Sequence, residues 1–152
     1  PQGLLSQLKG DTSITVDVEA RSHVEKVAMD AVIATEESMG NKVVDVSAEN
    51  CGWDLTARLP LADGKMVEDR HIEVKGRSKG QTTITVSRNE IIMGMNQQDK
   101  FYLAIVIVDG DSHDGPFYIQ NPFNQEPEFG VASINYQLSD LLSRATNPIK
   151  TI

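Results

Sequence analysis

The chain has 152 residues, enough for one ordinary domain and too few for two full-sized cores. Hydrophobic residues make up 39% and charged residues 24%, a balance typical of globular rather than disordered proteins. The single cysteine, Cys51, excludes an internal disulfide framework and a cysteine-rich zinc site, and favours a reducing, cytoplasmic location. No apolar run approaches the roughly 18 residues that a membrane-spanning helix needs.

The net charge of -8 argues against a generally basic nucleic-acid-binding protein. The charge is uneven, however, because residues 58–88 carry seven basic and four acidic side chains, a net +3 that leaves -11 for the remainder. A solvated hairpin would explain this segment, and so would a phosphate-facing edge on an acidic body.

In chain order, residues 1–21 show no steady period and are predicted to be an N-terminal arm or linker remnant. Within this arm, residues 14–18 alternate like a strand. The first residue is Pro1 rather than methionine, which indicates a processed protein or part of a longer one. A single domain is then predicted over residues 22–152. The capping-box pattern of Ser22 and Glu25 predicts that its first helix begins there and ends at Gly40.

The rest of the chain alternates between predicted strands and helices. Strands are expected over 42–46, 53–59, 71–75, 82–86, 101–108, 117–119 and 133–138, with helices over 87–95 and 139–145 and a basic loop over 76–80. The nearly continuous apolar run at 101–108 is typical of a strand covered on both faces. This order predicts an α/β fold in which helices flank a mixed central sheet.

The most informative residues are Asp54 and the segment Glu73-Val74-Lys75. Glu73 and Lys75 share one face of their predicted strand, and Asp54 enters the strand before it. Two carboxylates about 4 Å apart repel by roughly 4 kcal/mol at an effective dielectric near 20. A hard divalent cation such as Mg²⁺ offsets that repulsion. Lys75 would not bind the metal, but it can orient or deprotonate an attacking water.

These residues and their surroundings resemble the PD-(D/E)xK nuclease superfamily. Three segments taken in order, residues 49–55, 72–77 and 84–90, are similar more narrowly to the domain at the C-terminus of the plant NO VEIN protein. In that family the domain recurs on bacterial helicase-like and restriction-associated proteins. The resemblance implies a restriction-endonuclease-like fold with an αβββαβ core. One departure is Trp53, where the superfamily nominally has a proline.

The resemblance also implies roles for individual residues. Asp54 and Glu73 would bind Mg²⁺ or Mn²⁺ together with the backbone carbonyl of Val74, and Lys75 would be the catalytic lysine. Glu25 matches the position from which many members add another carboxylate, although an N-terminal helix cap explains it equally well.

Each assignment has a simpler alternative. Glu73 and Lys75 would also fit a same-face ion pair on an exposed sheet, worth about 0–1 kcal/mol. The basic residues that could bind nucleic acid are Arg77, Lys79 and Arg88. The first two could instead serve only to keep their loop soluble. Glu90 is predicted to be only a helix cap.

The sequence therefore supports three hypotheses. The first is a metal-dependent nuclease acting on DNA, carried by a larger protein with a helicase or other ATPase domain in the same or a partner chain. The second is a non-catalytic module of the same fold that binds nucleic acid or protein. The third is a purely structural domain.

Overall fold

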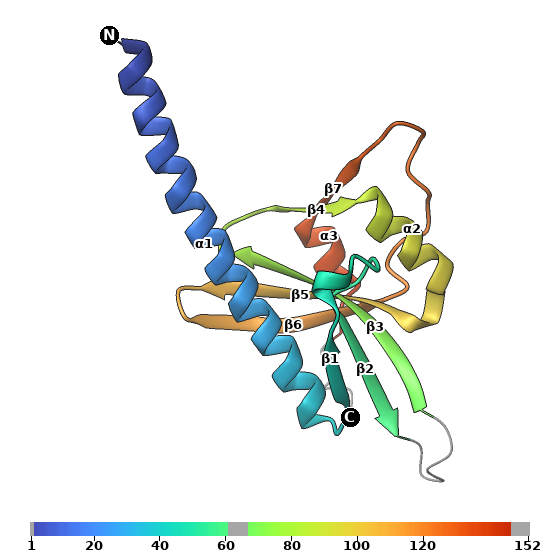
Figure 1. Ribbon diagram of the computed structural model, residues 1–152. Coiled ribbons are helices and arrows are strands. Elements are labelled where there is room, and N and C mark those ends of the chain that lie inside the picture. The colour runs from blue at the N-terminus through green and yellow to red at the C-terminus, as the bar shows by residue number, and fades with distance from the viewer. Residues whose placement is uncertain (1, 61–66, 147–152) are drawn as a thin grey trace.

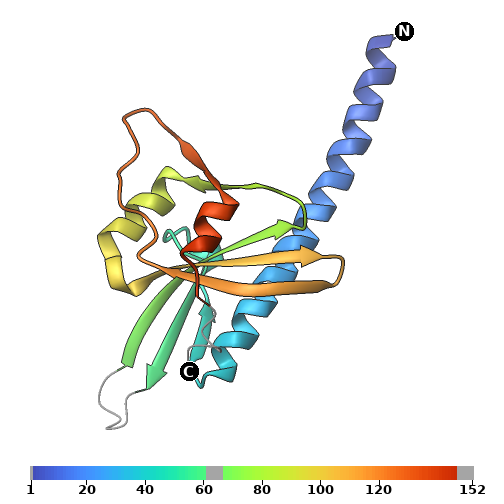
Figure 2. The same cartoon turned by 180° about the vertical axis from the view of Figure 1, so that it is seen from behind.

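The computed structural model describes residues 2–60 and 67–146, in which helices cover both faces of a central sheet (Figures 1 and 2). The helices are α1 (Gln2–Ser38), α2 (Arg88–Gln97) and α3 (Leu138–Ser143), with short 3-10 helices η1 (Ser47–Glu49) and η2 (Gln98–Lys100). The strands are β1 (Lys42–Asp45), β2 (Leu55–Pro60), β3 (Val67–Ser78), β4 (Thr83–Ser87), β5 (Phe101–Asp109), β6 (Ser112–Gln120) and β7 (Ser133–Gln137).

The central sheet has five strands in the order β1-β2-β3-β5-β6. Strands β3 and β5 are parallel, whereas the other neighbouring pairs are antiparallel. A parallel pair needs a crossover connection, and here the chain crosses over through β4 and α2. Strand β4 leaves the central sheet and pairs with β7 in a separate two-stranded sheet. The predicted α/β class with a mixed sheet between helices is confirmed, and it is consistent with a restriction-endonuclease-like fold.

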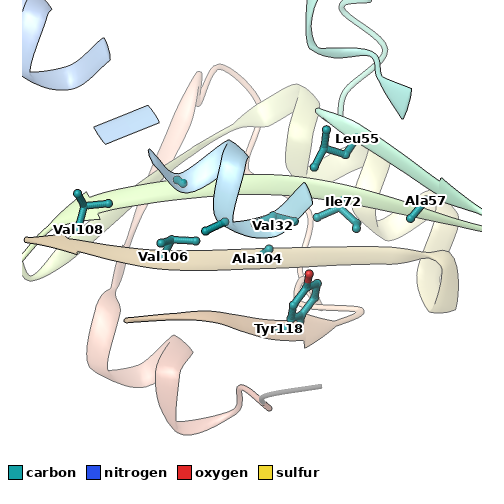
Figure 3. Close-up of a cluster of buried hydrophobic side chains, with 10 residues drawn as sticks. Val32, Leu55, Ala57, Ile72, Ala104, Val106, Val108 and Tyr118 are labelled. Carbon is teal, nitrogen blue, oxygen red and sulfur yellow. The ribbon is translucent and has the colours of Figure 1, made fainter. Parts of the chain in front are cut away.

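Two apolar cores lie on opposite faces of the sheet. The core beneath α1 includes Val32, Ile72 and Val106 (Figure 3). The core on the other face joins the sheet to α2, α3, β4 and β7, and it includes Phe101 and Ile105. Alternate residues of β5 point into the two cores, as successive side chains of a strand must. The sequence-based prediction that this strand is covered on both faces is therefore confirmed.

The helix α1 is much longer than the sequence predicted. It is continuous over Gln2–Ser38, and its N-terminal part extends away from the sheet (Figure 1). The predicted strand at 14–18 and the predicted helix start at Ser22 are therefore wrong. The β-branched residues of that segment disfavour a helix only weakly, by less than about 0.7 kcal/mol each. The capping-box pattern of Ser22 and Glu25 consequently lies inside the helix and caps nothing.

Three other boundaries differ from the prediction for identifiable reasons. The expected basic loop at 76–80 begins only after Ser78, because β3 continues its parallel pairing with β5 through that residue. The strand predicted at 117–119 is longer than expected, because β6 begins at Ser112 and pairs with β5 in a tight hairpin. The last helix begins at Leu138 and ends at Ser143, with no side-chain cap.

A buried polar cluster attaches the C-terminal end of α1 to the sheet. Glu36 is fully buried; it accepts a hydrogen bond of 3.2 Å from the Tyr118 hydroxyl and one of 3.4 Å from the Asn41 amide. The Arg70 guanidinium lies 3.7 Å from Glu36 Oε1 and 4.2 Å from the centre of the Tyr102 ring. These contacts fix the position of α1 along β3.

None of the described helices has both the length and the apolar character of a membrane span.

Candidate active site

Asp54, Glu73 and Lys75 lie together at the point where β2 begins beside β3. Antiparallel pairing sets Leu55 opposite Ile72, so Asp54 lies next to the segment that carries the other two residues. The Val74 amide donates a hydrogen bond of 2.9 Å to Asp54 Oδ2. Glu73 and Lys75 extend from the same side of β3, and their side chains approach to 3.5 Å between Glu73 Oε1 and Lys75 Nζ. The structure thus places all three residues in one cluster.

A tight turn delivers Asp54 to this position. Gly52 has φ +102°, and a Cβ atom there would lie 2.6 Å from the Met93 side chain of α2. Only glycine allows both this backbone conformation and this close approach. The Val46 amide then donates to the Asp54 carbonyl over 2.8 Å, which closes the turn against β1. The turn is consequently held between the sheet and α2.

Glu90 joins the cluster from the first turn of α2. It completes the predicted capping box with Ser87, so its role as a helix cap is confirmed. Its carboxylate also accepts hydrogen bonds of 3.1 and 3.0 Å from Lys75 Nζ. The prediction of a cap alone therefore missed a second role. The sequence did contain a signal of this second role, because Glu90 is the last residue of the third segment, 84–90, that resembles the family.

The electrostatics of the cluster follow from its burial. The Glu73 side chain is 7% exposed, and desolvation, a hydrogen bond with Glu90 and the charge on Asp54 raise the pKa of Glu73 to about 11. Burial also raises the pKa of Asp54. Burial pushes the pKa of Glu90 upward as well, but hydrogen bonds from Glu73 and from the Ser87 amide, with the charge of Lys75, outweigh it and lower that pKa to about 2. In the metal-free protein these effects favour the protonated form of Glu73, and a bound cation would displace that proton.

Three adjoining cavities surround these residues. The central one, of about 410 Å³, is lined by Asp54, Glu73 and Lys75. A second, of about 330 Å³, shares Asp54 and Glu73 with it and lies towards α2. A third, of about 520 Å³, follows α1 and shares Glu25 and Arg77 with the central cavity. Neighbouring cavities share wall residues, so the three adjoin one another around the carboxylates; we refer to the three together as the depression.

Helix α1 forms one wall of this depression because it approaches β3 closely. A Cβ atom at Gly76 would lie 2.8 Å from Ala28 Cβ and 3.0 Å from the Val24 carbonyl, so the glycine permits this contact. Glu25, one residue further along α1, consequently lines both the central and the third cavity. Since the helix does not begin near Glu25, the alternative explanation of that residue as an N-terminal cap is excluded.

The three basic residues proposed for nucleic-acid binding have different surroundings. Arg77 lines the central and third cavities, and its Nε is buried without a hydrogen-bond partner among the described residues. Lys79 lines neither of these cavities; its side chain is 72% exposed and lies 3.8 Å from Asp109. Arg88 donates to backbone carbonyls of the loop before β7, among them Glu128 O at 2.8 Å. Of these three residues, Arg77 is therefore the one that lines the depression.

A hard divalent cation at this cluster would have few protein ligands. Within residues 2–60 and 67–146, no group of three or more His, Cys, Asp or Glu side chains is arranged to hold a metal ion. Mg²⁺ does not require such a group, since it commonly binds one or two carboxylates and completes its shell with water and substrate phosphate. The buried carboxyls of Asp54 and Glu73, both with raised pKa values, would gain from a neighbouring positive charge.

The fold and the cluster together define an α/β domain with a buried carboxylate and lysine site at the start of β2. Comparison with known families places the chain more closely. Residues 24–119 match the family described as protein NO VEIN, C-terminal, and since the match covers more than half of the chain, the protein belongs to that family. The match includes every residue of the cluster. No curated protein and no solved structure gave a significant match.

Proposed function

We propose that this protein is a metal-dependent nuclease of the PD-(D/E)xK type that hydrolyses phosphodiester bonds in DNA. The observation that supports the proposal most directly is the convergence of Asp54, Glu73 and Lys75 on one cavity of about 410 Å³. Asp54 comes from the turn before β2, whereas Glu73 and Lys75 come from β3, and an ordinary exposed ion pair would require neither their burial nor a cavity beside them. A nuclease site requires both.

In this mechanism a water molecule attacks the phosphorus atom in line with the departing oxygen. Lys75 orients that water and offsets the charge that develops on the phosphate. Glu90 positions Lys75 by accepting hydrogen bonds with both carboxylate oxygens. Asp54, Glu73 and the Val74 carbonyl would hold Mg²⁺ or Mn²⁺, which supplies Lewis-acid stabilisation of the phosphate when bound. Glu25 is in place to contribute a further carboxylate from the cavity wall.

The test is cleavage of single-stranded and double-stranded DNA by the purified protein with Mg²⁺, with Mn²⁺ or with EDTA. We expect products only with a divalent cation, and none from the Asp54→Ala variant at equal concentration. Cleavage by that variant equal to cleavage by the wild type would count against the proposal. A thermal-shift titration with the same cations should show stabilisation of the wild type that the variant lacks. Absence of cleavage by the wild type on all these substrates would contradict the catalytic proposal.

Arg77 should contribute to DNA binding through a phosphate contact. We expect Arg77→Gln to weaken binding and to lower the slope of log K against log salt concentration by about one. Lys79→Gln is the matched control, because it removes the same charge from a side chain that lines neither the central nor the third cavity. Fluorescence anisotropy over a series of salt concentrations measures both slopes. Equal slopes for the two variants would contradict the contact.

A second candidate function is a non-catalytic module that binds nucleic acid or protein. One observation favours it: Lys75 forms ion pairs with two acidic side chains, those of Glu73 and Glu90. DNA binding that persists in EDTA, without products under any cation condition, would support this function over the nuclease.

The setting of the activity is part of the same proposal. DNA is the substrate, and a helicase or other ATPase domain in the same or a partner chain would present it. Such a helicase-linked or defence-related nuclease would act inside the cell, where its substrate lies. Co-purification of the full-length parent protein with DNA-stimulated ATPase activity would test this arrangement.

A further inference from the structure

The second cavity differs in chemistry from the other two. Its wall contains the acidic residues Asp54, Glu73 and Glu90, and neither lysine nor arginine occurs among its described lining residues. The central cavity shares Asp54 and Glu73 and adds Glu25, but unlike the second it also contains Lys75 and Arg77. Of the two cavities, only the central one therefore offers a phosphate group cationic partners. An anionic group is disfavoured in the second cavity, whereas a neutral group that carries hydrogen-bond donors is compatible with its acidic wall.

Two amide side chains supply the polar edge of this cavity. Asn50 follows η1 in the left-handed conformation, with φ 53°, and Asn89 lies in the first turn of α2. The Asn89 amide reaches over the turn, 3.7 Å from where a Cβ atom of Gly52 would be. The structure shows no hydrogen bond of either side chain to another described residue. Each amide offers both a donor and an acceptor, which is the combination that nucleobase edges require.

Trp53 supplies a rigid aromatic wall. Its ring stacks on His71 with 4.0 Å between the centroids and an interplanar angle of 13°. Its Nε1 donates a hydrogen bond of 3.0 Å to Thr56 Oγ1, and the His71 ring is itself held by a contact between its Nδ1 and Gln97 Oε1. The indole is thus held in place before any ligand arrives, so little conformational entropy is lost when a base contacts it.

We infer that the second cavity binds one nucleobase of the strand being cut, next to the phosphate that occupies the central cavity. This inference rests on the proposed function, because it assumes that the substrate is a nucleic-acid strand. A base bound in a cavity must be unstacked and unpaired. The protein therefore acts on single-stranded DNA, or on a nucleotide displaced from a duplex.

The experiment compares binding of a single-stranded oligodeoxynucleotide with binding of an abasic strand of equal length, both in EDTA so that no cleavage occurs. The wild type should bind the strand with bases more tightly, by roughly fivefold or more for one stacked base. In the double variant Asn50→Gly, Asn89→Ala this ratio should fall towards one, while the affinity for the abasic strand is unchanged. Glycine at position 50 keeps the left-handed backbone accessible, and a thermal melt confirms folding.

The control variant is Asn124→Ala, which removes the same amide from an exposed loop residue outside the cavity; it should keep the wild-type ratio. Equal binding of the two strands by the wild type, or an unchanged ratio in the double variant, would overturn the inference. Failure of the nuclease proposal looks different. A wild type that discriminates bases but never cuts supports the base site and contradicts only catalysis.

Discussion

Replacing Lys75 with methionine should lower the rate of DNA cleavage by about 10²–10⁴-fold, the range expected when a positioned group that assists proton transfer is removed. Methionine keeps most of the length and packing of the side chain but lacks the ammonium group. The loss should appear in the rate at saturating DNA, because Lys75 acts on the attacking water rather than on the bulk of the strand. Single-turnover kinetics with excess protein measures this rate directly.

The matched control for this prediction is Lys79→Met. Lys79 lies just beyond the end of β3, and its side chain is 72% exposed, whereas that of Lys75 is 20% exposed. The control should cleave at a rate within about twofold of the wild type, since exposed charges far from a reaction contribute little. A Lys75→Met protein that melts normally and cleaves at the wild-type rate would remove Lys75 from the mechanism.

Local sequence patterns predicted the sheet more accurately than the first helix. The run at 101–108 could be assigned to a buried strand because its residues are apolar on both faces, and β5 is buried on both faces. The start of α1 could not be found, because the Ser22 and Glu25 pattern imitates a cap that the longer helix does not use. The extent of β3 was missed for a different reason. Its last residues are held by pairing with β5, a contact between distant segments that no local pattern reveals.

The candidate site shows the same division between local and distant information. Asp54, Glu73 and Lys75 could be predicted because their spacing along two adjacent strands is visible in the sequence. The part played by Glu90 could not, because its capping motif with Ser87 already explained it locally. Only the crossover between β3 and β5, which brings the start of α2 beside β3, shows that one carboxylate serves as both a cap and a partner of Lys75.

Glu73 makes the site costly for folding, and this leads to a prediction about stability. In the unfolded chain the Glu73 carboxyl ionises near its ordinary pKa of 4.5, whereas in the folded protein its pKa is about 11. Between these values the folded protein binds a proton that the unfolded chain has released. Rising pH therefore favours unfolding throughout this window. Glu90 has the opposite effect, but only between about pH 2 and its ordinary value of 4.5.

Glu73→Gln should consequently stabilise the protein at neutral and alkaline pH while abolishing cleavage. Glutamine is neutral at every pH and can donate to Glu90 as the protonated acid does, so folding no longer requires the uptake of a proton. The stability difference between variant and wild type should grow with pH by up to about 1.4 kcal/mol per unit. Urea unfolding at several pH values between 6 and 9 measures it.

The exposed Glu37→Gln is the control for loss of one negative charge and should follow the wild-type curve. A Glu73→Gln protein no more stable than the wild type at pH 8 would show that the buried carboxyl ionises freely, and that its neighbours rather than its proton compensate for burial.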